Sequence, residues 1–157
     1  MKKIVVFVLS LCLVLALLTA SLANEVPPEA KKTFTPPAVV PAKEFEDFIG
    51  EWLFYVSISE SGKETSREQM LVDGLIDEHV ELTITESEIL LYTASTGKTE
   101  SVEYEFLPED GSLQILNVMH EPPVFRLADN GMLSLDVPAV SDIEGLTAYF
   151  TRKESQP

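Results

Sequence analysis

The chain has 157 residues, with 26 acidic against 11 basic side chains, and its formal net charge is −15 at pH 7. A surface of this sign repels nucleic acid and anionic lipid, which argues against both as partners, and it favours a basic protein partner or cations. The only cysteine is Cys12, so no disulfide can form within the chain.

The N-terminus has the pattern of a secretory signal peptide. Lys2 and Lys3 supply the positive n-region, and residues 4–18 are apolar except for Ser10. This apolar run is shorter than the about 20 residues with which a helix crosses a bilayer. We therefore predict a signal peptide over residues 1–23, export to the periplasm or the medium, and no membrane span after cleavage. An uncleaved N-terminal anchor is the alternative.

Cleavage is predicted after Ala23, because Ser21 and Ala23 place small side chains at the −3 and −1 positions. The mature chain would begin at Asn24 and would lose Cys12 together with two lysines, so that its net charge becomes 9 − 26 = −17. Without a thiolate, the mature protein has neither a cysteine nucleophile nor a cysteine metal ligand.

Residues 24–43 hold five of the ten prolines. Proline fixes φ and removes a backbone donor, so an extended and mobile tether is predicted here. The folded domain is then predicted over residues 44–153, and residues 154–157 form a C-terminal tail. A domain of 110 residues is large enough for one hydrophobic core.

The domain opens with a helical spacing of apolar residues and then changes to an alternating pattern. Phe45, Phe48 and Ile49 fit one short helical turn, which Gly50 ends. Alternating or short apolar runs follow, and each predicts a strand: residues 52–59, 80–85, 89–93, 102–106, 113–118, 124–127, 132–137 and 146–152.

Short strands joined by links of hairpin length predict an all-β fold. We expect a small antiparallel up-and-down barrel of about eight strands with a short N-terminal helical turn, because closure removes the unpaired edges that a sandwich keeps. The one long connection spans residues 60–77, and its middle, residues 66–71, is compatible with a second helical turn.

Both ends of the predicted domain resemble the lipocalin and calycin barrels. A helical turn followed by Gly-Glu-Trp at residues 50–52 is similar to the G-x-W entry of that family, and Tyr-Phe-Thr-Arg at residues 149–152 is similar to the end of bacterial lipocalin-like domains. The resemblance implies that Trp52 lies at the closed end of the barrel with Arg152 packed across it, as a structural pair. It also implies that the long connection covers the open end, where a small hydrophobic ligand binds.

No catalytic signature is present in the sequence. His79 and His120 are the only histidines, and neither lies in a motif that pairs a nucleophile with a base. Metal binding is the alternative use of these histidines, with Glu81 on the same strand face as His79 and with Glu121 next to His120. Solvated side chains account better for both pairs, so we predict no enzyme, no cofactor and no metal site.

The aromatic residues of the predicted strands carry a binding hypothesis. A barrel of about eight strands is just wide enough to be filled by side chains or to hold one small ligand. We predict ligand contacts for Phe54 and Tyr104 in the strands, and for Met70 and Leu71 in the long connection, where a solvated linker needs no apolar side chain. The alternative is that these residues fill and cap the core.

Two functions therefore stay open. The first is an exported, non-catalytic, lipocalin-like protein that binds a small apolar ligand in or at the mouth of the barrel. The second is an acidic protein-binding module, of the inhibitor or immunity type, that recognises a basic protein partner.

Overall fold

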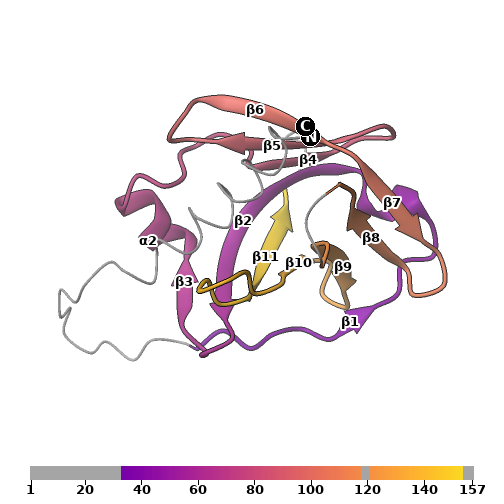
Figure 1. The fold of residues 1–157 in the computed structure, drawn as a ribbon, viewed down its shortest axis with the longest axis horizontal. Coiled ribbons are helices and arrows are strands. Elements are labelled where there is room, and N and C mark those ends of the chain that lie inside the picture. Colours follow the sequence, from indigo (N-terminus) through magenta and orange to yellow (C-terminus); the bar gives the residue numbers. More distant parts are fainter. Residues whose placement is uncertain (1–32, 118–120, 154–157) are drawn as a thin grey trace.

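The computed structural model describes residues 33–117 and 121–153 (Figure 1). The predicted signal peptide and its cleavage site, the start of the predicted tether, His120 and the C-terminal tail lie outside the described residues. Within them the chain is all-β with very little helix, and its antiparallel sheet is nearly closed into a barrel. The predicted fold class is confirmed.

The described elements follow one another as short strands with two helical turns. In chain order they are β1 (Val39–Val40), the 3-10 helix η1 (Phe45–Phe48), β2 (Gly50–Ser59), β3 (Glu64–Ser66), the α-helix α2 (Arg67–Val72), β4 (Leu82–Ile84), β5 (Ile89–Thr93), β6 (Lys98–Val102), β7 (Tyr104–Leu107), β8 (Ser112–Ile115), β9 (Val124–Ala128), β10 (Leu133–Val137) and β11 (Leu146–Arg152).

Every strand pairing in the sheet is antiparallel, and the strand order is β6-β5-β4-β2-β11-β10-β9-β8-β7. The two strands at the ends of this order, β6 and β7, are neighbours in the chain with only Glu103 between them. The single strand predicted over residues 102–106 is therefore wrong. Val102 pairs with Ile89 of β5 and Tyr104 with Ile115 of β8, so the chain changes partner strand at Glu103.

A bulge in β2 decides which of its side chains enter the barrel. The register with β11 pairs Phe150 with Phe54 and Tyr149 with Val56, which leaves Tyr55 as an extra residue. Phe54 therefore belongs to the main core, whereas Val56 lies in a second cluster with Tyr149, although strict alternation would place both on one face.

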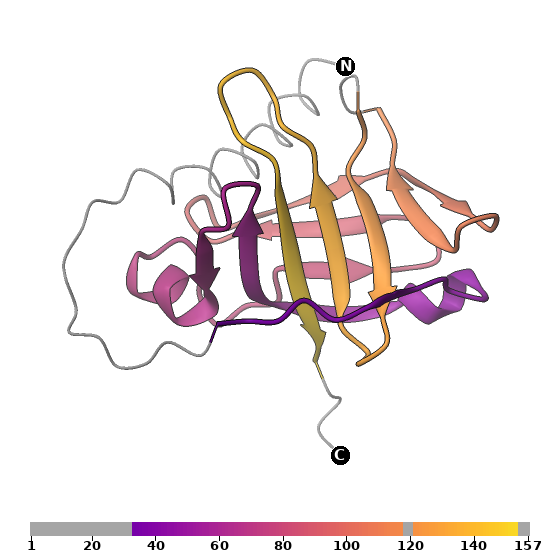
Figure 2. The ribbon, with the colours of Figure 1, turned by 90° about the horizontal axis from the view of Figure 1, so that it is seen from below.

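Residues 33–43, here called the N-terminal strap, correct the predicted tether. Val39 pairs with Ala128 and Val40 with Leu127, so β1 extends the sheet along the edge of β9 that β8 leaves open. Figure 2 shows the strap, in indigo, running across the strands of the barrel. The folded domain thus begins before residue 44, because backbone groups of the strap bond to the sheet.

The strap is fixed at both of its ends. The Ala42 N–H donates to the Gly111 carbonyl over 3.1 Å, and a Cβ at Gly111 would come within 2.4 Å of the Ala42 nitrogen. Phe34 packs against the second cluster, with its ring centroid 4.9 Å from that of Tyr149 and 5.7 Å from that of Tyr55. Proline-rich composition indicated an extended strap correctly, but extended chain can also add to a sheet edge.

The contact between Trp52 and Arg152 that the resemblance implies is present. Trp52 is fully buried, its Nε1 donates to the Phe48 carbonyl over 3.0 Å, and the Arg152 Cζ lies 4.5 Å from the Trp52 ring centroid. The two Nη atoms of Arg152 donate to the carbonyls of Ile49 and Asp47 over 2.8 and 2.7 Å. The guanidinium therefore joins η1 to the end of β11. We call this group, with η1, the Trp52 end.

Candidate functional site

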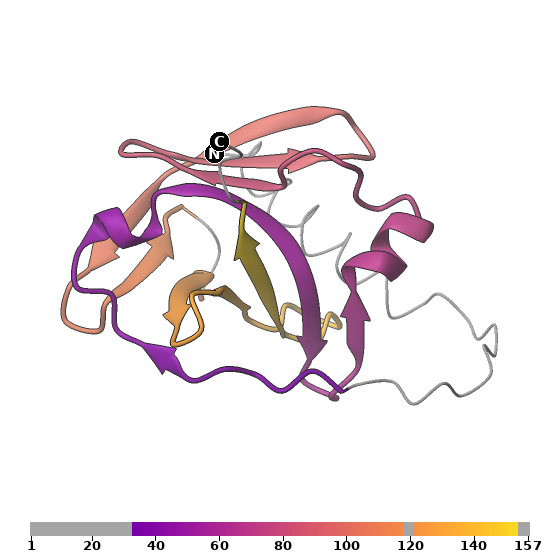
Figure 3. The same cartoon turned by 180° about the vertical axis from the view of Figure 1, so that it is seen from behind.

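The candidate site is the segment of residues 67–81, here called the α2 cover. It leaves the barrel after β3 and returns at β4, on the side opposite η1 (Figures 1 and 3). Its helix begins after Ser66, whose Oγ accepts from the Gln69 N–H over 3.3 Å. A helix of six residues is too short to be stable alone, so tertiary contacts must hold it.

The helix α2 ends in a Schellman motif. Gly74 has φ +66°, its N–H donates to the Leu71 carbonyl over 3.1 Å, and the Leu75 N–H donates to the Met70 carbonyl over 2.9 Å. In this motif the first residue after the glycine packs against the helix residue whose carbonyl it bonds. Met70 and Leu75 accordingly join the main core, while Leu71 and Val72 are 41% and 82% exposed.

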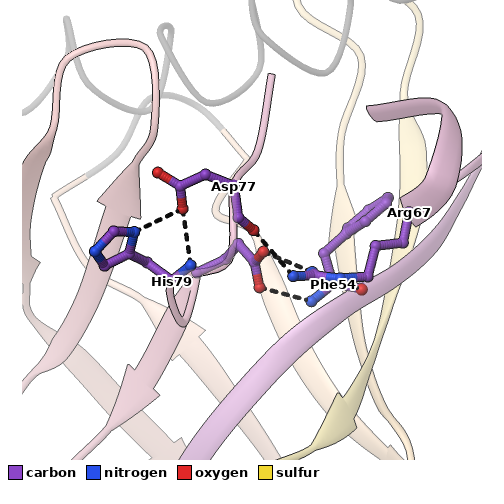
Figure 4. A network of polar contacts seen from close by, with 5 residues as sticks. Phe54, Arg67, Asp77 and His79 are labelled. Atoms are coloured by element: carbon purple, nitrogen blue, oxygen red, sulfur yellow. Dashed lines mark hydrogen bonds and ion pairs between the residues drawn. The ribbon is translucent and has the colours of Figure 1, made fainter. Parts of the chain in front are cut away.

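The edge of β2 has a gap in its backbone pairing where α2 lies. β4 pairs with residues 50–52 of β2 and β3 pairs with residues 56–58, which leaves Phe54 between them. The Phe54 N–H donates to Glu81 Oε2 over 3.0 Å, and Arg67 Nη1 donates to the Phe54 carbonyl over 3.2 Å (Figure 4).

The two side chains that fill this gap also form an ion pair. Arg67 Nη1 lies 2.6 Å from Glu81 Oε1, and the side chains are 24% and 11% exposed. Together they satisfy one N–H and one carbonyl of β2, as a neighbouring strand would. The second guanidinium nitrogen donates to the Asp77 carbonyl over 3.1 Å. Arg67 therefore holds the start of α2, the centre of β2 and the end of the cover in one arrangement.

Asp77 organises the last part of the cover. Its Oδ1 accepts from the His79 N–H over 2.8 Å and lies 2.9 Å from the His79 Nδ1, and its Oδ2 accepts from the Tyr92 hydroxyl over 2.8 Å. The His79 and Tyr92 ring centroids are 4.8 Å apart. These bonds attach residues 77–79 to β5.

The charge of Asp77 is stabilised by the same bonds. Loss of water raises the pKa of its carboxyl, but the hydrogen bonds from the His79 N–H, the Tyr92 hydroxyl and the His79 ring outweigh this, so the pKa of Asp77 lies below its ordinary value. The bond to Asp77 in turn raises the pKa of the Tyr92 hydroxyl. Asp77 is therefore a carboxylate at neutral pH, used as an acceptor for three donors.

Of the four predicted ligand contacts, Phe54 and Met70 are 3% and 2% exposed and belong to the main core, and Tyr104 is partly buried against that same core. Leu71 points toward solvent instead, because it follows the inward-facing Met70 by one position on a helix of about 3.6 residues per turn. Tyr104 belongs to the other side of the barrel, where its ring stacks on Phe45 of η1 at 5.1 Å and its hydroxyl donates to the Thr85 carbonyl over 3.1 Å.

The pairing of His79 with Glu81 on one strand face is contradicted. Neither residue lies within β4, which begins at Leu82, and each has another partner: His79 contacts Asp77, and Glu81 contacts Arg67. Sequence reasoning missed the role of Arg67. One signal was available, because Arg67 is the only basic residue between Lys63 and Lys98.

No family model, curated protein or solved structure matches this chain. Within residues 33–117 and 121–153, no three His, Cys, Asp or Glu side chains are grouped so that they could hold a metal ion. The helices of this same part of the chain are all too short or too polar to cross a membrane. At the α2 cover, the buried Met70 side chain lies on the same segment as the hydrogen-bonded polar groups of Arg67, Glu81 and Asp77.

Proposed function

We propose that the protein is an exported, non-catalytic, lipocalin-like binding protein that takes a small apolar ligand in the main core under the α2 cover, to which Met70 and Phe54 belong. The observation that carries this proposal is the gap in β2. At Phe54 the barrel edge is bridged by the side chains of Arg67 and Glu81 rather than by a strand. Side-chain contacts can break without unpairing a sheet, so the α2 cover can move away from β2 while the strand ladders are kept.

The chemistry of Met70 supports the same site. Methionine is unbranched and flexible, and it fills irregular apolar space that another apolar group can occupy. Met70 is 2% exposed and lies on a helix of six residues, so withdrawal of one side chain frees apolar volume beside Phe54 and Leu75. The polar groups around it are already bonded to each other, which favours an uncharged ligand over an ionic one.

Titration with N-phenyl-1-naphthylamine, an uncharged fluorescent probe, tests this function. We expect saturable binding with a dissociation constant on the order of micromolar. Met70→Trp, which fills the same space with a larger side chain, should abolish binding while the native circular dichroism is kept. Val39→Gln, a change at an exposed valine of the strap, is the matched control and should bind as the parent does. Folded protein without saturable probe binding contradicts the proposal.

The second candidate function is an acidic module that binds a basic protein. The net charge of −15 favours it. The burial of Met70 is also consistent with it, because a methionine that only caps a filled core leaves no space for a small ligand. Failure of the probe to bind, together with saturable and salt-sensitive binding of a cationic protein partner, makes this module the function.

Export is the part of the proposal that the N-terminal pattern supports. Intact mass of the protein recovered from the periplasm or medium should correspond to a chain that begins at Asn24. A recovered chain that still carries residues 1–23 means a membrane anchor instead.

A further inference from the structure

The outer side of α2 exposes two apolar side chains. Val72 is 82% exposed and Leu71 is 41% exposed, and both lie in the last turn of α2, which the Schellman motif at Gly74 ends. They follow the inward-facing Met70 by one and two positions on a helix of about 3.6 residues per turn, so their side chains point away from the core. The exposure of Leu71 and Val72 therefore follows from the regular, hydrogen-bonded backbone of α2.

Acidic side chains surround these two residues. Glu68 stands three and four positions before Leu71 and Val72, so all three share one helix face, and Asp73 follows directly. Glu68 and Asp73 are both exposed. We call Glu68, Leu71, Val72 and Asp73 the α2 outer surface.

The charge of the wider segment has the same sign. Residues 60–81 contain seven acidic residues and two basic ones. One of the two, Arg67, is ion-paired with Glu81 and directs its remaining donors to the carbonyls of Phe54 and Asp77. The field at the α2 outer surface is therefore negative, which repels anionic lipid and nucleic acid and attracts cationic groups.

We propose that the α2 outer surface docks a cationic amphipathic protein segment, one whose apolar side chains cover Leu71 and Val72 while its lysines or arginines face Glu68 and Asp73. Charge complementarity selects this partner, and the two exposed apolar side chains supply the burial that charge alone does not give. This inference rests on the second candidate function, the acidic module that binds a basic protein, and names the surface that such a partner would cover; it does not depend on the small-ligand function.

Fluorescence anisotropy with a short labelled helical peptide of leucine and lysine tests the proposal. We expect saturable binding by the full chain, and binding about tenfold weaker for Val72→Gln, since burial of one valine side chain is lost. Glu68→Gln should weaken binding and reduce its dependence on salt. Val72 is mostly exposed, so the thermal midpoint of Val72→Gln should equal that of the parent.

Two controls separate this surface from general attraction to an acidic protein. Val39→Gln changes another exposed valine, 55% exposed and on the strap, and should leave peptide affinity unchanged. A peptide of the same charge in which glycine replaces leucine should bind with an affinity lower by at least about tenfold. The proposal is overturned if both peptides bind equally, if Val72→Gln binds as tightly as the parent, or if Val39→Gln loses as much affinity. The uncharged probe and the peptide are titrated into the same parent protein, so failure of the small-ligand function, seen as no probe binding, is distinguished from failure of this one, seen as no peptide binding.

Discussion

The Trp52 end and the α2 cover enclose opposite sides of the same barrel by different physical means. At the Trp52 end, a fully buried indole and the Phe48 ring form part of the core, and the Arg152 guanidinium joins η1 to β11 through two backbone carbonyls. At the α2 cover, Met70 is the only side chain of the helix that is buried, and an ion pair substitutes for a strand.

The two ends differ in how easily their contacts can break. Burial of a large aromatic side chain is hard to reverse, because its removal leaves a large void. One flexible methionine and a set of side-chain hydrogen bonds can leave and return without disturbing the ladder of β2 and β11. The proposed function requires the barrel to stay closed at the Trp52 end and to open at the α2 cover. The following variants test that contrast, in order of expected effect.

Trp52→Ala should give the largest loss of stability, about 3–5 kcal/mol, as removal of a fully buried aromatic ring does. Urea unfolding followed by far-UV circular dichroism measures it. Trp52→Phe keeps most of the apolar volume and should lose clearly less. In the parent, the emission maximum of the single tryptophan should be that of a buried indole. A loss below about 1 kcal/mol for Trp52→Ala means that this end does not anchor the fold.

Met70→Ala should cost about 2–3 kcal/mol, in the lower part of the range for buried methionine, because a six-residue helix can relax toward the void. The same urea experiment measures the loss. Leu71→Ala, at the neighbouring residue that is 41% exposed, is the matched control and should cost much less. Equal losses for the two variants contradict the inward direction of Met70.

The ion pair at the gap should couple more strongly than an exposed pair elsewhere in the protein. A double-mutant cycle with Arg67→Met and Glu81→Gln should give an interaction energy of about 1–2 kcal/mol, because both side chains also hold Phe54. The pair Lys153 and Glu51, with side chains 47% and 50% exposed, is the control and should give less than about 0.5 kcal/mol. Similar energies in the two cycles would show that the gap has no special role.

Gly74→Ala should destabilise the α2 cover by about 1 kcal/mol, because an L-residue is strained at φ +66°. No atom lies within 4 Å of the position that the new Cβ would take, so steric overlap adds nothing. Thermal unfolding and hydrogen exchange of residues 67–81 are the measurements. Val72→Ala, which leaves the backbone unstrained, should change stability by less than about 0.5 kcal/mol.

Acid should loosen the α2 cover through Asp77. The pKa of this carboxyl is lower in the folded chain than in the unfolded one, so its contribution to stability is present above the unfolded pKa and is lost as pH falls through the folded pKa. Unfolding measured from neutral to acidic pH should show a shallower loss in Asp77→Asn than in the parent. Parallel curves for the two proteins mean that Asp77 does not link this segment to pH.

Local patterns in the sequence were sufficient for most strands. The short apolar run at residues 146–152 predicts a strand, and the structure forms β11 there. The helical turn before Gly50 also follows from a local signal, the spacing of Phe45, Phe48 and Ile49. The contact between Trp52 and Arg152 joins residues far apart in the chain, and the resemblance to the lipocalin barrels implied it where local pattern did not.

The α2 cover and the strap depended on tertiary structure. Val39 and Val40 carry no local strand pattern, and they form β1 only because β9 offers an unpaired edge after β8 ends. Arg67 and Glu81 are 14 residues apart, and their joint role exists only where β4 and β3 leave the backbone of Phe54 unpaired. Composition and periodicity determined where most of the strands lie. Only the registers of β3 and β4 along β2 decided which backbone groups were left without a partner strand, and hence where side chains had to supply one.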